Sequence, residues 1–315
     1  VYPSPGYPIY ESFAIYCDAT PVPLHLKEEK GFAFDAQDIA DLITPKTKLI
    51  FLNFPSNPTG GVATKEQITD IAKVIKEKCP PDVRVYSDEV YEHIVFDGLT
   101  HFSIASVPGM EKMTIVVSGA SKSYSWTGGR LGWAVFPTVE EAQMMKTLNI
   151  NYFSCTTPYS QYGAIVALES PETLPKIQEM VTAFQKRRDI VVAGLNKIDG
   201  IHCEKPQGAF YVFPNIVGAC EKMGIIEAYN TLSATEKMKT TPATLFQMFL
   251  LYNYQVAVMD RKSFGVLGSE GKRFIRISIA TATDDLIEAM KRIEAATKDK
   301  KGFLEFFKNV NTRAF

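Results

Sequence analysis

Three short runs of apolar and β-branched residues most constrain the fold of this chain. They cover residues 48–53, 83–87 and 113–117. After the first run, Thr64 precedes a segment with isoleucines on one helical face, and a capping residue before such a face predicts an amphipathic helix. Strands that alternate with helices are typical of a sheet of mostly parallel strands. We therefore predict an α/β fold.

The pattern changes after Pro137, where helical periodicity dominates. We predict helices over 139–149, 160–169 and 171–197, the last broken at Pro175, and strands over 210–213, 255–259 and 274–279. Residues 218–244 are polar without a clear period, which favours a surface excursion. We expect a large domain over 1–175, with a central, mostly parallel sheet flanked by helices, and a smaller α+β domain over 176–315.

Composition narrows the functional classes. The chain has 315 residues, 46% of them hydrophobic and 22% charged, with a net charge of −1. The sequence has no block of basic residues, so a nucleic-acid partner is not indicated. No apolar run is long enough to cross a membrane. The cysteines and histidines lack metal-ligand spacing, so we expect no metal site. Five cysteines, an odd number, indicate free thiols in a reducing compartment, and we expect a cytoplasmic protein.

Polar residues follow each of the three strands. After the first comes Asn57, in an Asn-Pro-Thr-Gly turn; after the second, Asp88; after the third, Lys122. Open α/β sheets bind ligands at the carboxyl ends of their strands, so the three side chains are predicted to line one crevice. Structural roles are the alternative, because Asn-Pro-Thr-Gly makes a turn and a carboxylate at this position caps a helix.

Lys122 lies among small residues in Ser118-Gly-Ala-Ser-Lys122, and Arg130 follows in Gly-Gly-Arg-Leu-Gly. A lysine that loses solvation has a lowered pKa, and its free amine attacks a carbonyl to form a Schiff base. The permanently charged fork of an arginine suits a phosphate. The two residues are therefore candidates for a carbonyl group and a phosphate, and a surface lysine with a salt-bridged arginine is the alternative.

In order and at similar spacing, three segments resemble motifs of the fold-type I pyridoxal-phosphate enzymes, class I/II aminotransferases in particular. They are Asn57-Pro-Thr-Gly, Ser87-Asp88-Glu-Val-Tyr91 and the stretch from Lys122 to Arg130. Further resemblance lies in Pro5-Gly-Tyr7-Pro-Ile-Tyr10, Lys205-Pro-Gln-Gly-Ala-Phe-Tyr211 and Arg273-Phe-Ile-Arg276-Ile-Ser. The resemblance therefore extends through nearly the whole chain.

The resemblance implies pyridoxal 5'-phosphate as cofactor. Lys122 would carry it as a Schiff base and later act as the general base. Asp88 would keep the pyridine nitrogen protonated, and Asn57 and Tyr91 would bond the ring oxygen O3'. Arg130 would bind the phosphate. Tyr7 would stack on the ring.

The resemblance also implies that Arg276 binds the substrate α-carboxylate, although Arg273 is close by and a surface arginine on an edge strand is the alternative. It implies a homodimeric aminotransferase that exchanges the amino group of an amino acid, aspartate or aromatic, with a 2-oxo acid such as 2-oxoglutarate. A carbon–sulfur lyase and an aminocyclopropane-carboxylate synthase share these residues. The alternative from another functional class is a non-catalytic effector-binding domain of a transcription regulator. A third alternative is an inactive remnant of the enzyme fold.

Two departures from the family pattern bear on the site. Gly119 stands where many members have a phosphate-contacting serine, so Ser118, Ser121 or a backbone amide would take that role. The family also has a segment before the Pro-Gly-Tyr-Pro turn, and we expect the first strand and the phosphate loop to lie upstream of Val1. We accordingly expect this chain alone to bind the cofactor poorly.

Overall fold

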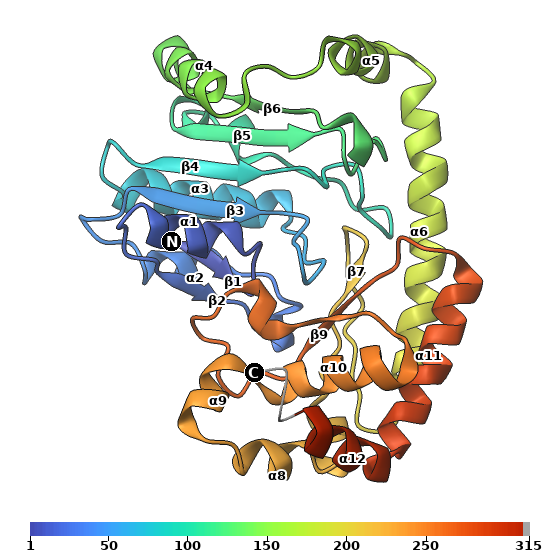
Figure 1. Ribbon diagram of the computed structural model, residues 1–315. Helices are drawn as coiled ribbons and strands as arrows, with labels where there is room; N and C mark the ends of the chain where they lie inside the picture. Colours follow the sequence, from blue (N-terminus) through green and yellow to red (C-terminus); the bar gives the residue numbers. More distant parts are fainter. Residues whose placement is uncertain (311–315) are drawn as a thin grey trace.

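The structure is a computed structural model that describes residues 1–310 (Figure 1). Its larger sheet has the order β3-β4-β5-β6, in which the first three strands are parallel and β6 is antiparallel to β5. The bounds are β3 (Leu49–Asn53), β4 (Arg84–Asp88), β5 (Thr114–Gly119) and β6 (Gly132–Val135). The α/β class and the mostly parallel sheet predicted from the sequence are confirmed.

A parallel pair of strands, β1 (Tyr2–Ser4) and β2 (Pro23–His25), lies beyond β3. The amino group of Val1 donates to the Leu49 carbonyl at 2.8 Å, and the Phe51 amide donates to the Val1 carbonyl at 2.9 Å. These two hydrogen bonds join the pair to the larger sheet.

Helices cover both faces of this sheet. Alternate residues of a strand point to opposite faces, so Ile50 of β3 packs in the cluster with α2 (Ala36–Ala40) and α3 (Lys65–Lys78). Phe51, the next residue, stacks on Tyr10 of α1 (Ile9–Tyr16) with ring centroids 4.6 Å apart. Thr64 caps α3 through a capping box, as the sequence predicts. The helix α1 therefore covers the face of the sheet opposite to α2 and α3.

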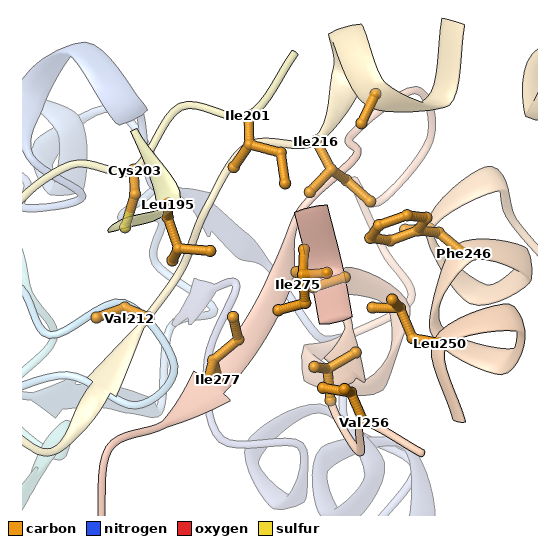
Figure 2. Packing of buried hydrophobic residues seen from close by; sticks show 14 of the residues in the cluster. Leu195, Ile201, Cys203, Val212, Ile216, Phe246, Leu250, Val256, Ile275 and Ile277 are labelled. Carbon is orange, nitrogen blue, oxygen red and sulfur yellow. The ribbon is translucent and has the colours of Figure 1, made fainter. Parts of the chain in front are cut away.

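The smaller sheet is antiparallel, with the order β7-β9-β8. Its central strand supplies Ile275 and Ile277, which face Phe246 and Leu250 of the neighbouring helix in a buried apolar cluster (Figure 2). The bounds in this part of the chain are β7 (Tyr211–Val212), β8 (Met259–Asp260), β9 (Ile275–Ser278), α7 (Val217–Lys222), α8 (Ile225–Asn230), α9 (Ala234–Lys239), α10 (Pro242–Tyr254), α11 (Thr283–Lys298) and α12 (Lys300–Val310).

In the sequence, three helices follow the larger sheet and precede the smaller one. The longest of them runs beside both sheets (Figure 1). They are α4 (Val139–Phe153), α5 (Pro158–Glu169) and α6 (Thr173–Leu195). Short 3₁₀ turns are η1 (Glu28–Lys30), η2 (Ile104–Ser106), η3 (Met110–Lys112), η4 (Thr127–Gly129) and η5 (Arg261–Phe264). Within residues 1–310, no helix combines the length and apolarity that crossing a membrane requires.

Three sequence-based predictions are wrong in detail. The segment 218–244 is not a surface excursion, because it contains helices too short to display a period, and Cys220 and Ile225 are fully buried. Pro175 does not break α6, since it lies in the first turn, where the amide needs no helical partner. The strand expected over 255–259 is reduced to Met259–Asp260, because the preceding helix extends to Tyr254. The division at residue 175 stays a prediction.

Candidate active site

The carboxyl ends of β3, β4 and β5 open into a cavity of about 480 Å³. Strand register places Asn53 beside Asp88, and Asp88 beside Val117. The cavity contains every site residue predicted from the sequence, with neighbours from both sheets. Its lining is Tyr7, Asn53, Asn57, Asp88, Val90, Tyr91, Val117, Ser118, Ser121, Lys122, Thr127, Arg130, Tyr211 and Arg276.

Lys122 is half-buried on the turn that follows β5. Burial lowers the pKa of its amine, the positive charges of Arg276 and Arg130 lower it further, and only Asp88 acts in the opposite direction. The Nζ atom lies 5.6 Å from the centroid of the Phe210 ring. Among residues 1–310 this lysine forms no salt bridge, so its amine is available to a ligand as a nucleophile or base.

Asp88 is the last residue of β4, and two hydrogen bonds hold its carboxylate. The hydroxyl of Tyr10 donates to Oδ2 at 2.6 Å, and the amide of Val90 donates to Oδ1 at 3.3 Å. Burial nevertheless raises the pKa of the carboxyl group, because these bonds and the charge of Lys122 only partly replace lost solvation. A cation placed against Asp88 would supply the missing compensation.

Arg276 of β9 reaches across from the smaller sheet. Its Nη1 donates to Oδ1 of Asn57 at 2.9 Å, and its guanidinium carbon lies 4.2 Å from the centroid of the Tyr211 ring. The buried Nε has no hydrogen-bond partner, and no carboxylate of the described residues pairs with the guanidinium. Burial lowers the pKa of this group. Arg276 is therefore a fixed cation with donors left for an anion.

Two tyrosines form one wall of the cavity. The hydroxyls of Tyr91 and Tyr211 lie 3.0 Å apart, and both side chains are buried. Burial raises the pKa of Tyr91 well above its ordinary value, so its phenol stays protonated at neutral pH. Tyr7 lies at the cavity mouth with 42% of its surface exposed.

The loop from Lys122 to Arg130 contributes further polar residues to the cavity lining. Arg130 has a left-handed backbone with a φ of 52°, and its Nη1 donates to the Thr127 carbonyl at 2.8 Å. A Cβ on Gly119 would lie 3.1 Å from the Leu131 carbonyl oxygen, because β6 pairs closely there. This tight pairing leaves little room for a serine at position 119.

Comparison with known proteins supplies the identity that the geometry suggests. The profile of the family described as aminotransferase class I and II matches residues 1–293. This chain is a class I/II aminotransferase. The resemblance inferred from the motifs is therefore confirmed, and so is a transaminase function.

Relatives with curated names support the same assignment. The aminotransferase is 35% identical, over 94% of its length and 69% of the relative's, to a probable aspartate/prephenate aminotransferase of Aquifex aeolicus. It is 34% identical to aromatic-amino-acid aminotransferase 2 of Thermococcus litoralis, over 95% and 70% of the two chains. The crystal structure of the Pyrococcus horikoshii aromatic aminotransferase superposes with a TM-score of 0.80 at 34% identity, covering 96% of this chain and 73% of that one.

Three residues at the site of the aminotransferase are not predicted from the sequence. Asn53 and Tyr211 line the cavity, and Tyr10 is hydrogen-bonded to the cavity residue Asp88. Tyr211 supports Arg276, and Asn53 donates from Nδ2 to the Asp88 carbonyl at 3.2 Å. A tyrosine on an apolar helix face resembles any core tyrosine, so Tyr10 gives no signal. For Tyr211 a signal exists, since it ends the Lys205–Tyr211 segment that resembles the family.

Proposed function

We propose that this aminotransferase holds pyridoxal 5'-phosphate in the cavity through Lys122 and exchanges an amino group between an amino acid and a 2-oxo acid. Charge supports the proposal. Lys122, Arg130 and Arg276 line one cavity and form no salt bridge among the described residues, while Asp88 is the cavity's one acid. Such a site favours a ligand with anionic groups and one cationic atom.

The donor set fits this cofactor. A cavity of about 480 Å³ is within the range usual for small-molecule sites, about 300–1,000 Å³. Asp88 would face the pyridine nitrogen, and Asn57 and Tyr91 would donate to the ring oxygen. Tyr7 would pack on the ring. Asn57 suits its role because Arg276 occupies its Oδ1, which leaves the Nδ2 donor facing the cavity.

Arg130 and Ser121 would bind the phosphate. Ser118 is less suitable, because its hydroxyl already donates to Glu92 Oε1 at 3.0 Å. The hydroxyl of Ser121 makes no hydrogen bond among the described residues, and it lines the cavity beside the lysine. A serine hydroxyl at position 119, as in many family members, would be crowded by the Leu131 carbonyl of the paired strand, so Ser121 is the better candidate.

When bound, the cofactor supplies an aldehyde that condenses with amines and a ring that stabilises negative charge at the substrate Cα. Arg276 would grip the substrate carboxylate through its free donors and so orient the Cα–H bond. The lowered pKa of Lys122 favours the unprotonated amine, and Nζ would remove the Cα proton and return it. Asp88 would remain ionised against the cationic nitrogen.

Aspartate or an aromatic amino acid is the proposed donor and 2-oxoglutarate the proposed acceptor. Names of the relatives support this range, since they include aspartate, aspartate/prephenate and aromatic-amino-acid aminotransferases. A screen of amino donors, with loss of the cofactor's aldehyde absorbance as the readout, distinguishes them.

The proposal also includes the oligomeric state and the location: the enzyme is a homodimer in the cytoplasm. Apolar side chains exposed along α4 and α5, among them Phe153 and Tyr162, support a covered surface in solution. Free cysteines support a reducing compartment. Light scattering coupled to size-exclusion chromatography measures the oligomeric state.

Lys122 in one cavity with Asp88 and an unpaired Arg276 is the observation that carries this function. Reduction with borohydride after incubation with pyridoxal 5'-phosphate should attach the cofactor's pyridoxyl group to the Lys122 peptide, identified by mass spectrometry. Lys122→Ala serves as the control and should give no label on that peptide. A label absent from Lys122, or attached equally to surface lysines, contradicts the proposal.

A further inference from the structure

The hydrogen bond between Tyr10 and Asp88 joins a buried residue outside the cavity lining to the carboxylate that lines the cavity. Tyr10 has 1% of its surface exposed, whereas Asp88 lines the cavity. The tyrosine ring is fixed by stacking on Phe51 at 4.6 Å and by edge contacts with Tyr7 and Tyr86 at 5.8 and 6.3 Å. Its hydroxyl therefore has one direction in which to donate.

Asp88 has few other groups to hold it. Oδ1 accepts a long bond from the Val90 amide at 3.3 Å, so the 2.6 Å bond from Tyr10 is the shorter of the two that orient the carboxylate. Hydrogen bonds to a charged acceptor in a buried site are among the strongest in proteins. The titratable and charged groups that act on this carboxylate or respond to it are Tyr10, Tyr86, Glu89, Tyr91 and Lys122.

We propose that Tyr10 is a positioning residue, whose hydroxyl fixes the Asp88 carboxylate in the orientation that presents it to a cationic ring nitrogen in the cavity. The inference rests on the proposed function, because it assigns Asp88 to that nitrogen. Tyr10 also favours the ionised form of the carboxylate. Burial raises the pKa of Asp88, and the donated hydrogen bond opposes that rise.

The Asp88 titration tests this role without any cofactor. In protein labelled with ¹³C at the aspartate carboxyls, the resonance that disappears in Asp88→Asn belongs to Asp88. Tyr10→Phe keeps the ring and its stacking on Phe51 but removes the donor, so the pKa of Asp88 should rise. Tyr86→Phe is the matched control, since the Tyr86 ring contacts Tyr10 and its hydroxyl makes no hydrogen bond to Asp88.

A second replacement, expected to shift the pKa of Asp88 in the opposite direction, tests the inference even if Tyr10→Phe folds poorly. Replacing Tyr10 with 3-fluorotyrosine makes the hydroxyl more acidic and a stronger donor, so the pKa of Asp88 should fall. An Asp88 titration that moves in neither variant, or that moves as much in Tyr86→Phe, overturns the inference.

Cofactor affinity gives the second readout. Titration of the cofactor-free protein with pyridoxal 5'-phosphate should show about tenfold weaker binding in Tyr10→Phe, a loss of about 1.4 kcal/mol, because the carboxylate that faces the ring nitrogen loses its shorter hydrogen bond. In an Asp88→Asn background the same change should have little effect. An equal loss in both backgrounds overturns the inference, because Tyr10 would then act independently of Asp88.

The two readouts separate this inference from the proposed function. If borohydride leaves Lys122 unlabelled, the proposed function fails. In that case the Asp88 titration still decides whether Tyr10 holds the carboxylate.

Discussion

Arg276 Nη1 and Asn57 Oδ1, 2.9 Å apart, join the two sheets across the cavity. The bond occupies the acceptor of the asparagine and one donor of the guanidinium, and it fixes the arginine over the Tyr211 ring. Nη2 of the arginine donates to Sδ of Met259 at 2.9 Å, so one hydrogen on each of Nη1 and Nη2 remains for a ligand. The cavity therefore depends on the relative placement of β9 and the turn that follows β3.

Arg276→Ala should lower kcat/KM for amino-acid substrates by roughly a hundredfold or more. Removing one partner of a buried, hydrogen-bonded charge pair costs about 2–5 kcal/mol. Simple amines without a carboxylate should be affected far less. Steady-state kinetics with an amino acid and its decarboxylated analogue check both statements.

Arg273→Ala is the control for that variant. Arg273 lies three residues away but lines a separate cavity with Phe213 and Phe274. Its removal should leave kcat/KM within a few fold of the unaltered enzyme. Equal losses of kcat/KM in the two variants would mean that the arginines stabilise the fold and that Arg276 does not bind the substrate carboxylate.

Arg276→Ala should also raise the pKa of Lys122. The positive charge of Arg276 disfavours the protonated amine, so its removal favours protonation, and the reactive free amine appears only at higher pH. The rate at which acetic anhydride labels Lys122 in the cofactor-free protein, followed by mass spectrometry across pH, measures this. In Arg273→Ala the midpoint should stay in place. A midpoint that moves to lower pH would contradict the assigned electrostatics.

The sequence predicts the site better than it predicts the segments around the site. Asn57, Asp88 and Lys122 each follow a strand whose apolar run is evident, and parallel strands bring their carboxyl ends together. A local pattern thus determines a long-range cluster. The hydrogen bonds from Tyr10 to Asp88 and from Arg276 to Asn57 connect positions 78 and 219 residues apart, and no local pattern encodes them.

The short helices show the opposite case. The helices α7 and α8 have six residues each, fewer than two turns, so an amphipathic period cannot be read from them. Their burial comes from contacts with α10 and, for α8, with α12, which the chain reaches only later.

Asp88→Asn should stabilise the cofactor-free protein while it weakens cofactor binding. Burial raises the pKa of the folded carboxyl above its unfolded value, so ionisation destabilises the native state, by about 1.4 kcal/mol for each unit of pKa. This destabilisation is present above the folded pKa and disappears as the pH falls below the unfolded one.

Urea unfolding at two values of pH checks this prediction. The gain in unfolding free energy of Asp88→Asn should be largest at neutral pH and should vanish in acid. A gain that is independent of pH would indicate a packing effect of the amide, and a loss at neutral pH would contradict the cost assigned to the buried charge.

Arg188 connects α6 to the segment after β4, and its partner should matter for stability. The buried guanidinium donates to both oxygens of Asp97 at 2.8 and 2.9 Å and lies over the Phe96 ring at 4.7 Å. Asp97→Asn should lower the unfolding free energy by about 1–3 kcal/mol, because it leaves the buried guanidinium without its main hydrogen-bonded partner. Asparagine tolerates the left-handed backbone of position 97, where φ is 57°.

Asp189→Asn separates this effect from a general loss of surface charge. Asp189 also pairs with Arg188, at 2.8 Å, but through one oxygen only, whereas Asp97 uses both; the two carboxylate side chains are similarly exposed, at 47% and 40%. Because the two-oxygen contact with Asp97 remains in Asp189→Asn, this variant should lose at most about 1 kcal/mol of unfolding free energy in urea. Equal losses in the two variants would show that the buried guanidinium needs net negative charge nearby and not the paired geometry of Asp97.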